Sequence, residues 1–212
     1  QSPGQLRLAC LLSGAAWDVP DDGAHYLELG CGVGLGAMVI AAANPGWRIT
    51  GLDFNPSHIA SARALARDTG LDNITFIEAD LGNFAESQAG LGLPEADIVT
   101  AHGVWSWVGP EVQAGIVRLL QAKLRAGGVF HLSYNALPGW QGMLAVQRLV
   151  REAGLRLGGR SDRQVQAGIA VMQELAAAEA LSLRGDTRVT AWIAKLAALS
   201  PSYLAHELMN AN

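Results

Sequence analysis

The chain has 212 residues, of which 50% are hydrophobic and 16% are charged, and its formal net charge is −4. This composition is typical of a globular protein with one substantial core and room for an appended subdomain, and it excludes a disordered chain. The negative net charge argues against a strongly basic surface that would bind the phosphate backbone of a nucleic acid, so nucleic acid is not the expected partner.

The cysteines and the hydrophobic runs further limit the class of protein to which the chain can belong. Cys10 and Cys31 have neither the spacing of a metal site nor that of a disulfide framework. No hydrophobic run reaches the roughly 20 residues of a membrane helix, and no signal-peptide pattern opens the chain. We therefore expect no metal, no membrane partner and a cytoplasmic location, while the oligomeric state stays open.

The first part of the chain alternates between short hydrophobic runs and stretches with helical periodicity. The expected strands are 26–29, 49–53, 73–77, 96–101 and 128–134. A helix before the first strand is indicated by Leu6, Leu8, Leu11 and Leu12. The apolar faces of three further helices are expected to be formed, in chain order, by Leu35, Met38, Val39 and Ala42; Ile59, Ala62, Leu65 and Ala66; and Val112, Ile116, Leu119 and Leu120. This alternation predicts an α/β fold with a parallel sheet, helices on both faces, and ligands at the carboxyl ends of the strands.

Local signals predict where the helices begin and end. Asn55 is a candidate N-cap, Pro56 suits a first helical turn, and Gly70 is expected to end that helix. A later helix is expected from Pro110 to about residue 125, where Gly127-Gly128 would end it before the last strand.

From Pro138 onward the only periodicity is helical. It follows the hydrophobic positions of 143–150, 165–172 and 192–199, with breaks at Gly158-Gly159 and Pro201. We therefore predict a Rossmann-like core at residues 1–137 and a helical subdomain at 138–212.

A glycine-rich turn follows the first strand. It has the sequence Glu28-Leu29-Gly30-Cys31-Gly32-Val33-Gly34, and Asp53 ends the next strand. Glycine permits positive φ and close approach of a ligand, and the following helix presents unpaired N–H groups. The dinucleotide fingerprint would need a third glycine at Leu35, so this pattern indicates another kind of nucleoside site, in which Asp53 bonds the ribose hydroxyls. Cys31 is expected to fill space in the turn.

Three segments carry the remaining polar and aromatic candidates. Asp80-Leu81 ends the third strand, His102-Gly-Val-Trp105-Ser-Trp107-Val108 follows the fourth, and Ser133-Tyr134-Asn135-Ala-Leu-Pro-Gly-Trp140 closes the fifth. In a parallel sheet these segments meet at the edge where ligands bind.

The pattern Glu-x-Gly-x-Gly-x-Gly resembles motif I of the class I methyltransferases that use S-adenosylmethionine (SAM). The segments 102–108, 133–140 and 201–210 (PSYLAHELMN) are together similar to bacterial methyltransferases with a methyltransferase regulatory domain, a family that includes rickettsial protein-lysine methyltransferases. The resemblance covers nearly the whole chain. Class I methyltransferases usually have seven strands and this family continues beyond such a segment, so we expect the chain to be part of a longer protein.

The resemblance implies SAM as cofactor and S-adenosylhomocysteine as product. Asp80 would accept the adenine amino group, with Phe54 and Leu81 on either side of the ring, and His102 would reach the methionyl part. The complete set of expected cofactor-binding residues is Glu28, Gly30, Cys31, Gly32, Gly34, Asp53, Phe54, Asp80, Leu81 and His102.

The resemblance also implies transfer of the methyl group by direct displacement. The expected catalytic residues are His102, Trp105, Trp107, Tyr134 and Asn135. His102 has an alternative role in orienting its loop, and the tryptophans have one in packing. The acceptor stays open between a protein lysine and a small molecule methylated at nitrogen or oxygen. A SAM-binding regulatory module is the non-enzymatic alternative, and aminopropyl transfer is disfavoured because the loop after the fourth strand has no carboxylate.

Overall fold

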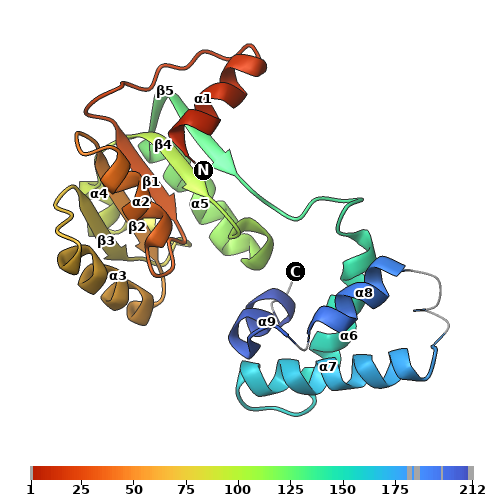
Figure 1. The fold of residues 1–212 in the computed structure, drawn as a ribbon. Helices are drawn as coiled ribbons and strands as arrows, with labels where there is room; N and C mark the ends of the chain where they lie inside the picture. The colour runs from red at the N-terminus through yellow and green to blue at the C-terminus, as the bar shows by residue number, and fades with distance from the viewer. Residues whose placement is uncertain (1, 181–182, 184–186, 197, 210–212) are drawn as a thin grey trace. The chain divides into compact units, whose positions relative to one another are not determined.

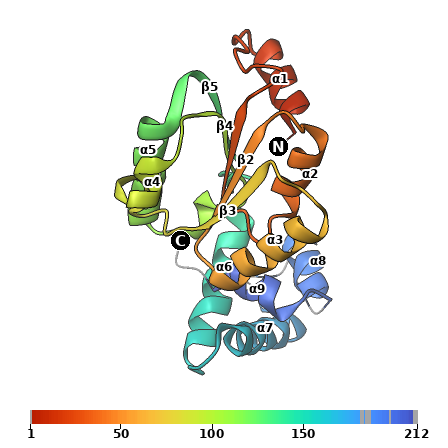
Figure 2. The same ribbon diagram turned by 90° about the vertical axis from the view of Figure 1, so that its left-hand side faces the viewer.

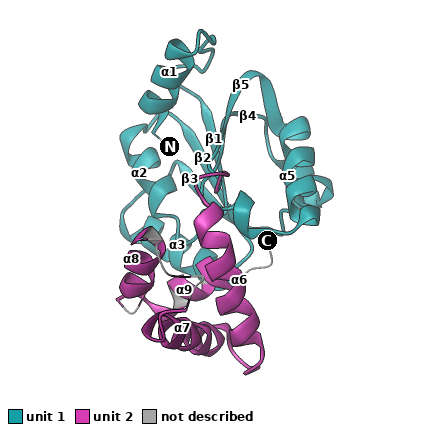
Figure 3. Ribbon diagram, turned by 90° about the vertical axis from the view of Figure 1, so that its right-hand side faces the viewer, with its two compact units in different colours: residues 1–134 teal, residues 135–212 magenta. Residues whose placement is uncertain are grey.

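The computed structural model describes residues 2–180, 183, 187–196 and 198–209, and these divide into two compact units, residues 1–134 and 135–212 (Figures 1 and 3). The predicted boundary lies at 137, just inside the second unit. Among the described helices, none is long and apolar enough to cross a membrane.

The first unit is built on a parallel sheet with the strand order β3-β2-β1-β4-β5. The strands are β1 His25–Leu29, β2 Arg48–Asp53, β3 Ile74–Glu78, β4 Ala96–Ala101 and β5 Leu124–Leu132. All four pairings are parallel, so the carboxyl ends of the strands lie along one edge. The predicted α/β Rossmann-like class is confirmed.

Helices cover both faces of this sheet (Figures 1 and 2). On one face, α1 Pro3–Leu12, α2 Leu35–Ala43 and α3 Pro56–Asp68 pack against a core that includes Tyr26 and Ile98. On the other face, the short helix η1 Phe84–Glu86 and α5 Pro110–Lys123 pack against a core that includes Leu27 and Val99. Helix α4 Gln88–Gly92 and the short helix η2 Trp105–Trp107 complete the unit. The central strand β1 is buried along its whole length, as expected for a parallel sheet covered on both faces.

Two predicted helix faces, those of α2 and α3, are wrong in part, and Leu65 of α3 is 42% exposed. Leu35 and Val39 are 63% and 59% exposed, because α2 faces the sheet with Ala37, Met38, Ile40 and Ala41. In α1 only Leu6 is buried, and Leu8, Leu11 and Leu12 face solvent.

The role predicted for Gly127-Gly128, to end the helix that starts at Pro110, is also wrong. Helix α5 ends at Lys123, and β5 begins at the next residue. Gly127-Gly128 lies inside β5, at a register shift where Ala96 faces Leu124 but Ile98 faces Val129. The extra residues form a bulge, which Gly127 accommodates with a φ of +78°. The start of α3 agrees with its prediction, since the Asn55 side chain accepts from the Ser57 N–H at 2.9 Å.

The second unit is helical. It contains α6 Gln141–Leu155, α7 Ser161–Ala177, α8 Thr187–Leu196 and α9 Pro201–Leu208, which share a core that includes Val150, Met172 and Leu196. The Gln147 amide donates to the Leu208 carbonyl at 3.1 Å, which joins α6 to α9. No strand occurs among the described residues of this unit, in agreement with the predicted helical subdomain, and Asn210 of the third family segment lies outside them.

A testable consequence concerns the bulge. Asp97 is the acceptor for the His25 N–H at 2.7 Å and for Arg125 Nε, and its side chain is 13% exposed. Replacing it leaves both donors without an acceptor, so Asp97→Ala should lower the free energy of unfolding by about 1.5–3 kcal/mol. Urea unfolding followed by tryptophan fluorescence measures this loss. The control is Asp21→Ala, whose 93%-exposed carboxylate pairs with Arg7 and contributes less than ~1 kcal/mol. Equal losses of unfolding free energy in the two variants would contradict the stabilising role assigned to the hydrogen bonds of Asp97.

Candidate active site

The glycine turn packs closely against two side chains, one from β3 and one from the loop after β4. Gly30 and Gly34 have φ of +68° and +78°. A Cβ on Gly30 would lie 2.5 Å from Val104 Cγ2, and one on Gly34 would lie 2.5 Å from Phe76 Cε1. Both positions therefore require glycine for conformation and for space. The sequence analysis did not identify Val104 and Phe76 as supports of the turn.

Asp53 joins the glycine turn to the end of β2. Its side chain accepts from the Gly32 N–H at 2.8 Å and from the Asn55 N–H at 2.9 Å. His58 Nδ1 lies 3.2 Å from the same oxygen that Asn55 contacts. Sequence reasoning missed His58, although the Asn55 cap fixes the first turn of α3 near the end of β2 and would have placed it there.

Glu28 lies below the turn and is only 7% exposed. Burial raises the pKa of its carboxyl group to about 7, against the opposing effect of the Ala37 N–H. Among the residues that the structure describes, none is a hydrogen-bond partner for its Oε2. Cys31 has a pKa raised to about 12, chiefly by burial, so its thiol is neutral at physiological pH and unsuited to nucleophilic attack.

A polar row crosses the sheet beside the turn. Glu28 faces Thr100, and Thr100 faces His131. The Thr100 hydroxyl donates to the Tyr26 hydroxyl at 3.1 Å. His131 stacks with His102 at a centroid distance of 6.2 Å, and burial together with His102 lowers the pKa of His131. His131 was not predicted, because only the register between β4 and β5 reveals it.

The loop after β4 is held in place by hydrogen bonds. The Gly103 N–H donates to Ser133 Oγ at 2.9 Å, which ties this loop to the end of β5. The Gln113 amide donates to the Trp105 carbonyl at 3.0 Å. His102 is exposed, Trp105 and Trp107 are half-buried, and Tyr134 is 59% exposed. Asn135 begins the second unit, so its place in an acceptor channel stays a prediction.

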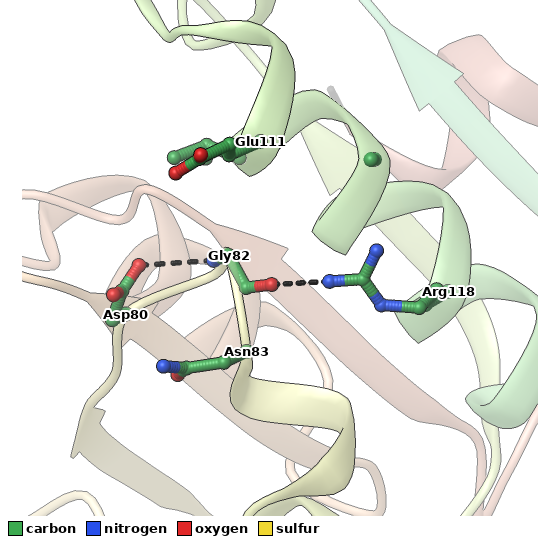
Figure 4. Close-up of a pocket in the computed structure, with 7 residues that line it drawn as sticks. Asp80, Gly82, Asn83, Glu111 and Arg118 are labelled. Atoms are coloured by element: carbon green, nitrogen blue, oxygen red, sulfur yellow. Dashed lines mark hydrogen bonds between the residues drawn. The ribbon is translucent and has the colours of Figure 1, made fainter.

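Asp80 borders a cavity of about 390 Å³ (Figure 4). Its carboxylate accepts from the Gly82 N–H at 2.9 Å, and Asn83, Glu111 and Arg118 also line the cavity. Of the two residues expected beside adenine, Phe54 is 76% exposed, whereas Leu81 is packed in the core at 7% exposure. The placement of adenine between these two side chains stays a prediction. The described residues hold no group of three or more candidate metal ligands.

Comparison with known proteins agrees with this geometry. Residues 27–130 match the family model of a methyltransferase domain. Along 99% of this chain, PKMT2 from Rickettsia typhi in complex with AdoHcy has the same fold, with a TM-score of 0.76, 23% sequence identity and 39% of that protein covered. Residues 27–130 form a class I, SAM-dependent methyltransferase domain, with the five-stranded sheet and glycine turn described above.

Relatives in sequence extend beyond this segment. The uncharacterized protein sll1526 of Synechocystis is 29% identical over 209 residues, which are 99% of this chain and 40% of that protein. The uncharacterized protein RP028 of Rickettsia prowazekii is 31% identical over 133 residues, which are 63% of this chain and 50% of that protein. A tRNA (guanine-N(7)-)-methyltransferase of Yersinia pseudotuberculosis is 30% identical over 128 residues, with 57% of this chain and 52% of that protein covered. The chain thus spans about half or less of the length of these relatives.

The close packing of the turn gives a matched pair of variants. Gly34→Ala should destabilise the protein by about 1–3 kcal/mol more than Gly32→Ala. Both glycines have positive φ, but only Gly34 has Phe76 within reach of a new Cβ, whereas nothing lies within 4 Å at Gly32. Thermal unfolding of the two variants measures the difference, and a Gly32 variant as unstable as the Gly34 variant would refute the packing argument.

Proposed function

We propose that this chain supplies the SAM-binding and methyl-transferring part of an enzyme that methylates lysine side chains of proteins. The observation that carries the proposal is the unit formed by Glu28, the glycine turn and Asp53, in which the Gly32 N–H donates to the Asp53 carboxylate. The likeness over 99% of this chain to PKMT2 supports the choice of acceptor.

The residues of this unit suit the three parts of SAM. Helix α2 begins after Gly34 without a side-chain cap, and the N–H groups of such a helix start suit a negatively charged ligand group. Asp53 would hold the ribose hydroxyls and Glu28 the charged amino acid part. Asp80 would accept from the adenine amino group, with Phe54 and Leu81 beside the ring.

Methyl transfer requires an acceptor that is neutral and aligned. SAM supplies the electrophilic methyl group, and the protein supplies alignment and exclusion of water. A lysine amine must first lose its proton, which costs roughly 4.6 kcal/mol at pH 7 because the ordinary pKa of lysine is about 10.4. Trp105, Trp107 and Tyr134 would surround the aliphatic stem and favour the neutral amine, and His102 would accept the proton.

Other acceptors are less consistent with the chain. The tRNA methyltransferase relative covers 57% of this chain, but a net charge of −4 does not favour binding to RNA. The segments after β4 and β5 contain no arginine for a carboxylate or phosphate substrate. A protein partner and a cytoplasmic location stay predictions from the sequence.

The cofactor assignment predicts a loss of SAM affinity in variants of Asp53. Asp53→Ala removes an acceptor of charged hydrogen bonds, and it should weaken SAM binding by about 1.5–3 kcal/mol. Titration calorimetry measures the dissociation constant for SAM. The value for Asp53→Asn should lie between those of Asp53→Ala and the wild type, because asparagine keeps one oxygen acceptor. Asp21→Ala serves as the unchanged control. An affinity for SAM in Asp53→Ala equal to that of the wild type would contradict the assignment of Asp53 to the ribose hydroxyls.

The acceptor assignment predicts a separation of turnover from cofactor binding. Trp107→Ala and Tyr134→Ala should each lower methyl transfer more than tenfold, which corresponds to over ~1.4 kcal/mol in the barrier, while SAM affinity changes little. The assay incubates the full-length protein with cell lysate and labelled SAM, and it maps the label by peptide mass spectrometry. Tyr203→Ala, which removes a half-exposed ring from α9, is the control.

The molecule that carries the label identifies the methyl acceptor. Label on lysine side chains supports the proposal, whereas label only in small molecules or RNA rejects it. Absence of transfer despite SAM binding favours a regulatory module. Equal loss of SAM binding in the Trp107 and Tyr134 variants would return both rings to a structural role.

A further inference from the structure

Glu28 is a buried carboxyl group with an unsatisfied oxygen. Its side chain lies under the glycine turn at 7% exposure, and Oε2 has no hydrogen-bond partner in the described structure. An ionised carboxylate is costly to bury unless it is paired or hydrogen-bonded. The free protein therefore favours the protonated form of this group.

The titratable groups around Glu28 do not compensate a negative charge. Tyr26, on the same strand, has a pKa raised to about 12, and the Cys31 thiol has a pKa raised to about 12, so both are neutral. Glu28 and Asp53 both contribute to the shift at Cys31, which places two acidic groups around this thiol. Neither neutral group can pair with a carboxylate as a cation would.

The neighbouring helix and strands stabilise a negative charge on Glu28 only weakly. In α2, the Ala37 N–H favours the ionised form but does not offset burial. In β4, the Thr100 hydroxyl faces Glu28 in register but donates to Tyr26. His131 lies one strand further along the row, and its lowered pKa makes it neutral near pH 7. The amino-terminal ammonium also favours the ionised form, but it is the weakest of the three effects on the pKa of Glu28. In the described parts of these elements no cation faces the carboxyl group, and a positively charged ligand would supply one.

We propose that Glu28 is partly protonated in the free protein near pH 7, and that it releases this proton to solvent when SAM binds. The inference rests on the proposed function, in which Glu28 lies beside the charged amino acid part of SAM. On binding, the O–H bond of the carboxyl group breaks, the buffer accepts the proton, and the carboxylate pairs with the positive charge of the cofactor. Binding of SAM and ionisation of Glu28 are then one event.

This coupling gives cofactor binding a defined dependence on pH. Burial raises the pKa of Glu28 in the free protein to about 7, and an adjacent cation lowers it in the complex. Below pH 7 binding must also expel the proton, so affinity rises as pH rises. With a pKa of about 7, the dissociation constant for SAM should fall about tenfold between pH 6 and pH 8.

Calorimetry in buffers of different ionisation enthalpy counts the protons directly. At pH 7 we expect about half a proton released per SAM bound, since a group with a pKa of about 7 is half protonated there. The matched ligand is 5′-methylthioadenosine, which keeps the nucleoside but lacks the amino acid part and the positive charge. It should release no proton. Equal release with both ligands, or none with SAM, would overturn the inference.

A variant assigns the released proton to its residue. Glu28→Gln should abolish the release and leave a dissociation constant that varies with pH only as far as SAM itself titrates. Asp53→Asn is the matched control, because it weakens binding but keeps Glu28 and should keep the release. Identical release in the Glu28 variant and the wild type would refute the assignment.

The two hypotheses fail in different ways. Binding of SAM without proton exchange would overturn the coupling and leave the proposed function standing. No binding of SAM at all would overturn both. If Glu28→Gln does not fold, the comparison of SAM with 5′-methylthioadenosine on the wild-type protein still tests whether binding is coupled to proton release, since it requires no variant.

Discussion

The hydrogen bond from the Gly32 N–H to the Asp53 carboxylate joins the two halves of the candidate site. It fixes the glycine turn after β1 relative to the end of β2, and Asn55 and His58 hold the same carboxylate from the start of α3. The turn is further confined by Val104, which leaves no room for a Cβ at Gly30. Three strand ends thus converge on one short backbone segment, which prepares it for a ligand before the ligand arrives.

The parallel sheet explains why these groups converge. With the order β3-β2-β1-β4-β5, the first strand lies at the centre and the chain reverses its direction of winding beside it. Residues in register share a face, so Glu28, Thr100 and His131 form a polar row on the face that α2 covers. The opposite face carries a hydrophobic core against α5. The site is therefore polar on one side of the sheet only.

Burial of polar groups is the cost of this arrangement. Tyr26 and Thr100 satisfy each other, whereas Glu28 keeps an oxygen without a partner. Unpaired buried polar atoms are rare in folded proteins, and a ligand that completes the hydrogen bonding is one reason for their presence. The domain thus retains a local instability at the place where the proposed cofactor would compensate it.

The sequence by itself determined the elements and the candidate turn. Hydrophobic periodicity predicted β4 at its observed bounds, and the Asn55-Pro56 signal predicted the start of α3, because both depend on neighbours along the chain. Tertiary structure alone decided the bulge at Gly127, the pairing of His131 with His102 and the burial that sets the pKa of Glu28. These features arise from strand register and packing, which bring together residues far apart in the sequence and leave no local signal.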